Sequence, residues 1–237
     1  MKIAIVIPTY NEKKNIRELV KALFKINNKF HIFIVDDNSP DGTGKLIDQL
    51  KKKYPNLHAL HRPVKQGIGP AYIFGFSRAL EIKPDYIIQM DADFSHPPEV
   101  IPEMLQKIRK ADLVIGSRYC RGISVLNWPL RRLLLSYFAN LLARFLTGIP
   151  VTDATGGFKC FRARVLSSID LSRIKSNGYF FQIEMNYAVF KNNFRIIETG
   201  IVFTDRHAGT SKMTRSIIFE ALIRLFFLRF KKYQHSR

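Results

Sequence analysis

The first half of the chain alternates between short apolar runs and longer amphipathic segments, and this alternation constrains the fold more than any other feature. The apolar runs are rich in branched residues and occupy residues 2–8, 31–37, 56–62, 85–93 and 111–117. Apolar side chains recur three and four positions apart between them, in residues 15–26, 42–54, 69–82 and 99–110. Such strands and helices in alternation predict an α/β fold with a mostly parallel, Rossmann-like sheet flanked by helices.

Polar loops follow three of the predicted strands. They read "PTYNE" at residues 8–12, "DDNSPDGT" at 36–43 and "DADFSH" at 91–96. Ligands of α/β sheets bind at the carboxyl ends of the strands, so these loops predict one binding site at that edge. No Walker sequence G-x-x-x-x-G-K-[ST] occurs, and no G-x-G-x-x-G follows the first strand. The loops therefore do not indicate an ATPase or a dinucleotide-binding protein.

Two aspartates, Asp91 and Asp93, end the strand at residues 85–93, in a chain with 38 basic and 19 acidic residues. Taken alone, the pair has two interpretations: it caps a turn, or it binds a divalent cation. Side chains two positions apart on a strand share a side, and carboxylates suit Mg²⁺ or Mn²⁺ on a diphosphate. Ser95 offers a further oxygen.

The formal net charge of +19 predicts an anionic partner. Residues 1–117 carry 18 basic and 13 acidic side chains, whereas residues 118–237 carry 20 and 6. Nucleic acid, anionic lipid headgroups and phosphorylated substrates are the candidate classes of partner. The aromatic residues concentrate in apolar helical segments and the acidic ones gather at the sheet edge, which argues against a nucleic-acid-binding protein.

The segment at residues 127–148 predicts a helix with a polar stripe. Arg132, Ser136, Asn140 and Arg144 recur every four residues among leucines and aromatics. An ordinary amphipathic helix has this pattern, but a guanidinium one turn from a hydroxyl also suits a phosphate.

The carboxyl-terminal segment predicts contact with a membrane surface. Residues 217–230 are apolar except for Glu220, Arg224 and Arg229, and more basic residues follow. The run is shorter than the roughly 20 residues that span a bilayer, so an amphipathic helix in the interface is expected. Packing of this helix on the domain or on a partner is the alternative. We expect residues 1–213 to form the main domain and residues 214–237 the helix.

Two features bear on the compartment. The cysteines Cys120 and Cys160 are not arranged as a metal site, and free thiols in a reducing compartment are expected. The apolar run at the amino terminus stops at Pro8, too early for a signal peptide, and predicts a first strand instead.

Eight short blocks carry a resemblance to a known family. They are "PTYNE", "VDDNSPDGT", "DADFSHPPE", "GSRY", "W-x-x-R-R-x-x-x-S", "DATGGFK", "GYFFQIEM" and "DR-x-x-G-x-SK", in order from Pro8 to Lys212. In this set the chain resembles the dolichol-phosphate mannose synthases, which are polyprenyl-phosphate hexosyltransferases of glycosyltransferase family 2. The resemblance implies a GT-A fold with carboxyl-terminal amphipathic helices at the membrane surface.

The resemblance also implies an activity. Mannose would pass from GDP-mannose to dolichyl or another polyprenyl phosphate, giving dolichyl β-D-mannosyl phosphate by a metal-dependent inverting displacement. Glucosyl transfer from UDP-glucose to a polyprenyl phosphate is the alternative. The enzyme would be membrane-associated on the cytoplasmic face, with a small membrane-anchoring subunit as a further candidate partner and no nucleic acid.

Roles for individual residues follow from the matching positions. The nucleoside would be held by Pro8, Tyr10, Glu12, Val35 and Asp37, with Asp36 supporting the loop. The nucleotide sugar would contact Asp91, Ala92 and Asp93, and the metal ion, Mg²⁺ or Mn²⁺, would bind Asp93 and Ser95. The acceptor phosphate would be held by Arg118, Arg132 and Ser136. The loop that closes over the diphosphate and the phosphate would contribute Arg206 and Lys212.

The chemistry needs no strong general base. A phosphate monoester has a second pKa near 6, roughly, and is largely a dianion at neutral pH. Positioning of the phosphate against the anomeric carbon and neutralisation of charge are what the residues must supply. In-line attack would convert an α-linked sugar nucleotide into a β-linked product. Asp153 either caps a turn or faces the sugar, and Gln182 and Glu184 either contact substrate or are structural.

Overall fold

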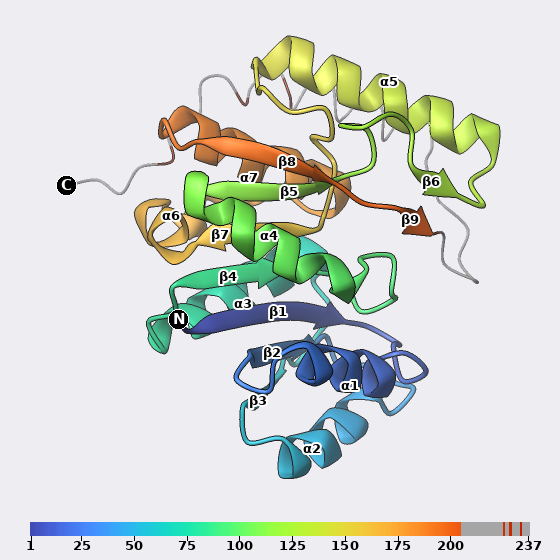
Figure 1. The fold of residues 1–237 in the computed structure, drawn as a ribbon. Coiled ribbons are helices and arrows are strands. Elements are labelled where there is room, and N and C mark those ends of the chain that lie inside the picture. The colour runs from blue at the N-terminus through green and yellow to red at the C-terminus, as the bar shows by residue number, and fades with distance from the viewer. Residues whose placement is uncertain (205–224, 226–227, 229–232, 234–237) are drawn as a thin grey trace.

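The computed structural model describes residues 1–204 together with Leu225, Leu228 and Tyr233. A seven-stranded sheet runs through the middle of the domain in the order β3-β2-β1-β4-β7-β5-β8 (Figure 1). Its strands are β1 (Ile3–Thr9), β2 (His31–Asp36), β3 (Leu57–His61), β4 (Tyr86–Gln89), β5 (Leu113–Ser117), β7 (Lys159–Arg162) and β8 (Ile196–Gly200). The predicted mixed α/β fold with a mostly parallel sheet is confirmed.

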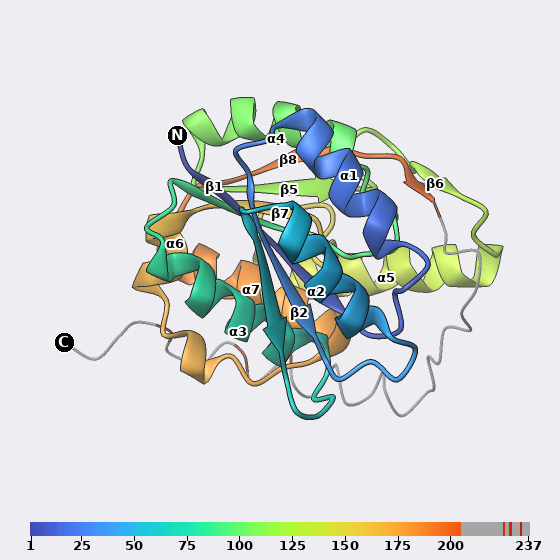
Figure 2. The ribbon, with the colours of Figure 1, turned by 90° about the horizontal axis from the view of Figure 1, so that it is seen from below.

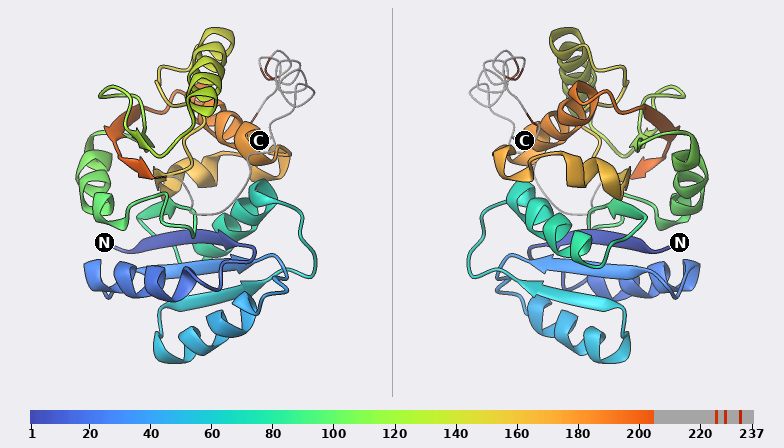
Figure 3. Two further views of the ribbon diagram at one scale, coloured as in Figure 1. Left: turned by 90° about the vertical axis from the view of Figure 1, so that its right-hand side faces the viewer. Right: turned by 90° about the vertical axis from the view of Figure 1, so that its left-hand side faces the viewer.

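Helices cover both faces of the sheet because its strands alternate apolar side chains between the two faces (Figure 2). In β1, Ala4 and Val6 pack toward one core, while Ile5 and Ile7 pack toward the other. The first core includes α3 (Ile68–Glu81), α6 (Ala163–Ser168) and α7 (Gly178–Lys191). The second includes α1 (Ile16–Ile26), α2 (Thr43–Lys53) and α4 (Ile101–Lys107). Figure 3 shows the sheet between these layers.

Strand β7 runs against its neighbours. It pairs antiparallel with β4 on one side and with β5 on the other, with Cys160 opposite both Ile88 and Val114. Its amino end therefore lies at the sheet edge where β4 and β5 have their carboxyl ends. This reversal brings residues 153–157, which precede β7, next to the loops that follow β4 and β5.

Helix α5 (Leu130–Thr147) lies along the outside of the domain, beyond β8 (Figure 1). A two-stranded parallel ribbon is formed by β6 (Val125–Leu126), which comes shortly before α5 in the sequence, and β9 (Phe203–Thr204). Among the residues that the structure describes, no helix is long and apolar enough to cross a membrane.

The expected carboxyl-terminal helix lies largely outside the described residues. Of this segment, Leu225, Leu228 and Tyr233 are described, and all three are buried in the core cluster that includes α7. The Tyr233 hydroxyl donates to Glu184 (3.1 Å), and the Tyr233 carbonyl accepts from the Asp170 amide (2.9 Å). These three residues therefore pack on the domain, as the alternative interpretation of this segment expects.

Candidate active site

The loop after β2 is built around the carboxylate of Asp36. Its Oδ1 accepts from the hydroxyls of Thr9 (3.1 Å) and Ser39 (2.5 Å), and its Oδ2 accepts from the Ser39 amide (3.1 Å). Gly44 leaves the space for this carboxylate, since a Cβ there would lie 3.0 Å from Oδ2. Asp36 thus supports the loop from inside.

Asp37 is the neighbouring carboxylate and is also buried. Arg62 donates from Nη1 to its Oδ1 (2.8 Å), and the Gln66 amide lies 3.3 Å from its Oδ2. Arg62, which sequence reasoning missed, comes directly after β3 and fixes the orientation of Asp37. Its only signal in the sequence is its place at the carboxyl end of a predicted strand.

The other residues predicted to hold the nucleoside lie at the same edge. Tyr10 is partly exposed beneath the ammonium of Lys65, 3.6 Å from its ring centroid. The Glu12 carboxylate accepts from the side-chain Nδ2 of Asn15 (2.8 Å), and Pro8 is half-buried. Val35 has its side chain in the core, so it could meet a ligand only through its backbone.

The loop after β4 holds its two aspartates in defined positions. Tyr72 donates its hydroxyl to Asp91 Oδ1 (2.6 Å), and the Asp91 amide donates to Nδ1 of His96 (2.9 Å). Asp93 Oδ1 accepts from both the amide (3.1 Å) and the hydroxyl (2.6 Å) of Ser95. Ala92 between them is buried. His96 therefore supports this loop.

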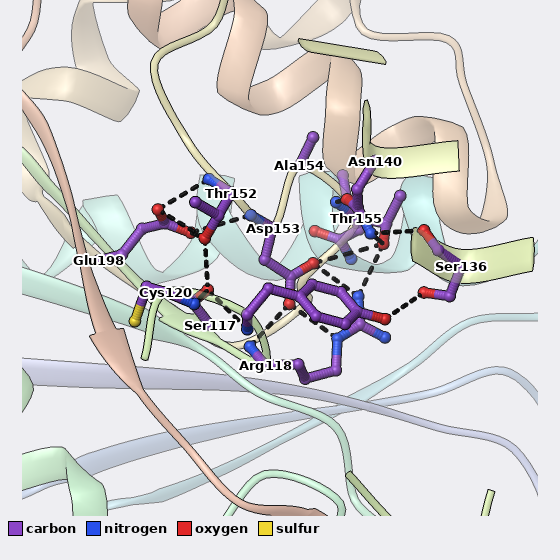
Figure 4. Close-up of polar contacts among 12 residues, drawn as sticks. Ser117, Arg118, Cys120, Ser136, Asn140, Thr152, Asp153, Ala154, Thr155 and Glu198 are labelled. Atoms are coloured by element: carbon purple, nitrogen blue, oxygen red, sulfur yellow. Dashed lines mark hydrogen bonds and ion pairs between the residues drawn. The ribbon is translucent and has the colours of Figure 1, made fainter. Parts of the chain in front are cut away.

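Arg118 and Asp153 form the centre of the second half of the site (Figure 4). Asp153 is fully buried and Arg118 is 5% exposed. The guanidinium donates from Nε to Asp153 Oδ2 (2.7 Å) and from Nη2 to Oδ1 (2.6 Å), and Nη2 also reaches the Thr155 hydroxyl (2.7 Å). Burial alone would raise the pKa of Asp153, but Arg118 outweighs it and the pKa is lowered. The structure therefore gives Asp153 the task of holding Arg118.

Glu198 on β8 anchors the loop that carries Asp153. Its carboxylate accepts from the amides of Thr152 (2.8 Å) and Asp153 (2.9 Å) and from the Thr152 hydroxyl (2.9 Å). The Thr152 hydroxyl also lies 3.1 Å from that of Ser117, at the end of β5 (Figure 4). The position of Arg118 is thus set from two strands.

Three of the four residues in the polar stripe of α5, Arg132, Ser136 and Asn140, face the domain. Ser136 accepts from the Tyr119 hydroxyl (2.8 Å), and Asn140 Oδ1 accepts from the Thr155 amide (3.0 Å). Arg132 lies over the ring of Trp128, 4.2 Å from its centroid. Arg144, the fourth member of the stripe, is exposed. The contacts bring Arg132 and Ser136 to the same side of the domain as Arg118.

The outer face of α5 is apolar and exposed to solvent. Its side chains are at least 47% exposed and comprise Leu130, Leu134, Tyr137, Phe138, Leu141 and Phe145. The helix is therefore amphipathic in the opposite sense to an ordinary surface helix. Such a continuous apolar face marks a surface that contacts another phase or molecule.

Comparison with known sequences decides the family. The family model described as "Glycosyl transferase family 2" matches residues 4–170. The chain belongs to glycosyl transferase family 2. As a member of this family it is a glycosyltransferase, and the edge of the sheet described above is its candidate active site.

Three similar proteins carry related names. The polyprenol monophosphomannose synthase of Mycolicibacterium smegmatis is 44% identical over 223 residues, covering 93% of this chain and 84% of that protein. The undecaprenyl-phosphate mannosyltransferase of Micrococcus luteus is 41% identical, with 94% and 92% covered. The dolichol-phosphate mannosyltransferase of Pyrococcus furiosus is 35% identical, with 95% and 63% covered.

Among solved structures, glucosyl-3-phosphoglycerate synthase from Mycobacterium tuberculosis is similar in fold. The complex of that protein with Mn²⁺, UDP-glucose and phosphoglyceric acid superimposes with a TM-score of 0.68 at 16% identity, over 96% of this chain and 79% of that one. At this identity the likeness concerns the fold alone, and it agrees with the expected GT-A-like architecture.

This glycosyltransferase also has a buried lysine that sequence reasoning missed. Lys159 at the start of β7 is fully buried and donates to the carbonyl (3.1 Å) and the side-chain oxygen (2.6 Å) of Gln182. Gln89 donates to the same side-chain oxygen (2.7 Å) and to the carbonyl of Gly157 (2.8 Å). Burial lowers the pKa of Lys159 to about 7, against the pull of Asp153 and Asp91.

Two residues of α7, Gln182 and Glu184, make contacts that support the fold. Gln182 joins Lys159 and Gln89, and so connects α7 to the strands on which both halves of the site are mounted. Glu184 is buried and accepts from the Ser176 amide (3.2 Å) and the Tyr233 hydroxyl (3.1 Å). Both partners of Glu184 are groups of the domain itself, which favours the structural interpretation of this residue.

The donor set after β4 fits a divalent cation that is shared with a diphosphate. In the described part of the chain, no group of three or more histidine, cysteine or acidic side chains is arranged to hold a metal. Mg²⁺ in nucleotide sites takes only one or two carboxylates from the protein and the rest from phosphate and water. Asp93 with the Ser95 hydroxyl beside it, and Asp91 nearby, meets that smaller requirement. Arg206 and Lys212 lie outside the described residues.

Proposed function

We propose that this glycosyltransferase transfers mannose from GDP-mannose to dolichyl or another polyprenyl phosphate, giving the β-mannosyl phosphate lipid. The names of the relatives at 35–44% identity carry the proposal, since all three join mannose to a polyprenol phosphate. The geometry of the site supports the proposal in two ways. The guanidinium of Arg118 is held in place for a phosphate, and the acidic loop after β4 suits a nucleotide sugar with its cation.

The acceptor phosphate would be held by Arg118, Arg132 and Ser136. Asp153 and Thr155 occupy Nε and Nη2 of Arg118, and within the described residues Nη1 makes no hydrogen bond. Ser136 accepts from Tyr119, so its own hydrogen can be donated to a phosphate oxygen. Because its guanidinium is already fixed, Arg118 loses little conformational freedom when the phosphate binds.

The donor would lie along the loops after β1, β2 and β4. Pro8, Tyr10, Glu12, Asp37 and the backbone of Val35 would surround the nucleoside. The diphosphate would be held near Asp91, Ala92 and Asp93, with Asp93 and Ser95 as the residues for Mg²⁺ or Mn²⁺. A bound cation would stabilise the negative charge of the departing nucleoside diphosphate. Arg206 and Lys212 would close over the same groups.

The phosphate oxygen of the acceptor would then attack the anomeric carbon directly. Its negative charge makes it a nucleophile without proton removal, so the residues need only orient it and balance its charge. The attack comes from the face opposite the leaving group, and the configuration at the anomeric carbon inverts from α to β.

The enzyme would work at a membrane surface on the cytoplasmic face. The exposed apolar face of α5 lies on the helix that also carries Arg132 and Ser136, so insertion of this face would bring the headgroup of a lipid phosphate to the site. We propose residues 1–213 as the catalytic domain, and residues 214–237 or a small anchoring subunit as a second attachment.

The test is a transfer assay with purified protein, a polyprenyl phosphate in detergent, Mg²⁺ or Mn²⁺, and either GDP-mannose or UDP-glucose. We expect a mannosyl lipid from GDP-mannose, with a β linkage by NMR, and competition by GDP but not by UDP. If product forms from UDP-glucose alone, the enzyme transfers glucose and not mannose. No glycolipid from either donor would refute it.

A further inference from the structure

Trp128 touches both arginines of the proposed acceptor site. The centroid of its ring lies 5.4 Å from the guanidinium carbon of Arg118 and 4.2 Å from that of Arg132. A guanidinium over an indole face is attracted by the ring quadrupole, and tryptophan gives the strongest such contact. One ring thus holds two positive groups that would otherwise repel each other.

The surrounding backbone fixes the ring. Asn127 adopts a left-handed conformation (φ 61°) that turns the chain out of β6, and Pro129 opens α5 immediately after Trp128. Phe203, brought in by the pairing of β9 with β6, packs edge-on against the indole with the ring centroids 5.5 Å apart. The Phe203 ring also lies 5.5 Å from the Arg118 guanidinium carbon. Trp128 is therefore held in one orientation before any ligand binds.

The indole nitrogen of Trp128 is buried and, within the part of the chain that the structure describes, has no hydrogen-bond acceptor. Buried N–H groups without an acceptor are rare in folded proteins, and an indole N–H can only donate. The group that satisfies it must bring an acceptor oxygen. Two guanidinium groups on the same ring select an anionic one.

We propose that Trp128 is a ligand contact of the acceptor site, whose indole N–H donates to an oxygen of the acceptor phosphate while its ring sets the positions of Arg118 and Arg132. The inference rests on the proposed function in one respect, that the acceptor is a phosphate monoester. It adds the indole N–H to the two guanidinium groups and the Ser136 hydroxyl, so that four groups from two segments converge on one phosphate.

Two substitutions separate the N–H from the ring. Trp128→Phe keeps an aromatic face for the arginines and removes the donor, whereas Trp128→Leu removes both. Tyr54→Phe, which also removes one polar group from an aromatic ring but stacks on Phe24 at the end of α2, is the matched control. Steady-state assays with GDP-mannose and citronellyl phosphate give KM for each substrate, and thermal melting checks that each variant is folded.

We expect Trp128→Phe to raise KM for citronellyl phosphate about ten- to a hundredfold, the range for loss of a hydrogen bond to a charged group, with KM for GDP-mannose unchanged within about twofold. Trp128→Leu should raise the acceptor KM further. Wild-type values for Trp128→Phe, or a rise confined to GDP-mannose, would overturn the inference and leave the proposed function standing. If Trp128→Leu does not fold, Trp128→Phe alone decides.

A second measurement is independent of transfer. Trp128 is the only tryptophan of the chain, so emission excited at 295 nm reports this ring alone. We expect a saturable change on titration with citronellyl phosphate, and none of that size with citronellol, which lacks the phosphate. A change with no transfer from any donor would refute the proposed function but keep the site. No change in an enzyme that transfers mannose would overturn the inference about Trp128.

Discussion

Asp153 holds Arg118 by two parallel hydrogen bonds, with Nε 2.7 Å from Oδ2 and Nη2 2.6 Å from Oδ1, in a place where both side chains are almost completely buried. The two residues come from different segments: Arg118 directly follows β5, and Asp153 lies in the loop that precedes β7. Because β7 is antiparallel to β5, its preceding loop reaches the same edge as the loop that follows β5. The pair fixes a cation where an anionic substrate is expected.

Removal of the charge of Asp153 should harm both stability and acceptor binding. Asp153→Asn leaves a buried guanidinium without its counter-ion, and breaking a buried pair in this way costs about 3–5 kcal/mol. We expect urea unfolding to show a loss of that order and a higher KM for the acceptor. Asp48→Asn, which removes an exposed partner of His61, should change stability by less than about 1 kcal/mol. Equal effects of the two substitutions would contradict this role.

Lys159 should make stability rise with pH above neutrality. Its pKa is about 7 in the folded protein and 10.5 ordinarily, so between these values the unfolded chain binds more protons than the folded one. The free energy of unfolding then increases from pH 7 toward pH 10. The increase is about 1.4 kcal/mol per pH unit, and so a few kcal/mol in total. Below pH 7 the full cost of burying the charged amine is present.

The measurement is urea unfolding at pH 6, 7.5 and 9 for wild type and Lys159→Met. The wild type should gain stability relative to the variant as pH rises, while Lys52→Met, at an exposed position of α2, should leave the slope unchanged. A constant difference between wild type and Lys159→Met at all three pH values would show that the amine keeps its ordinary pKa.

Glu198 should act on the acceptor half of the site alone. Glu198→Gln keeps the size of the side chain but replaces one oxygen by a donor that faces the amides of Thr152 and Asp153. Loss of such contacts costs about 1–3 kcal/mol, and the displaced loop should raise the acceptor KM more than that of the donor. Glu81→Gln, at the exposed carboxyl end of α3, is the control, and a larger effect on the donor KM would exclude the expected role.

Chelation should abolish transfer and added Mn²⁺ or Mg²⁺ should restore it. Asp93→Asn should lower kcat/KM by about a hundredfold or more, since a neutral amide oxygen is a weaker ligand for a hard cation. Ser95→Ala should have a smaller effect, because the Ser95 amide still donates to Asp93 Oδ1. Full activity in chelator would refute the metal requirement, and Ser77→Ala on α3 serves as the matched control.

The apolar face of α5 should carry membrane binding. Phe145 is 83% exposed, so Phe145→Asp should weaken flotation with vesicles that contain anionic lipid and leave the thermal stability unchanged. Val64→Asp, at a position 54% exposed at the other end of the sheet, should float as the wild type does. Unchanged binding of Phe145→Asp would remove α5 from the proposal.

Much of the fold could be predicted from the periodicity of apolar residues. In residues 1–117 these residues recur at the spacings of strands and helices, and the same side chains form the core of the folded domain. Strand β7 did not follow, since four residues with a lysine and an arginine at its ends do not resemble a central strand. The stripe on α5 was visible, but whether it faced solvent or the domain depended on contacts from Tyr119 and Thr155. Ion-pair partners such as Arg62 and Asp37 are distant in the sequence, so no local sequence pattern predicts their contact.

The reversed strand β7 has a consequence for how the two substrates are kept in register. Strands β3, β2, β1 and β4 carry the loops that we propose for the donor, whereas β5, β8 and the contacts to α5 carry those that we propose for the acceptor. Four residues join these halves through backbone hydrogen bonds on both sides. The separation between the two binding surfaces is therefore a property of the main chain. Side chains on either half can diverge to suit a new sugar or a new lipid without disturbing the alignment of the reacting atoms.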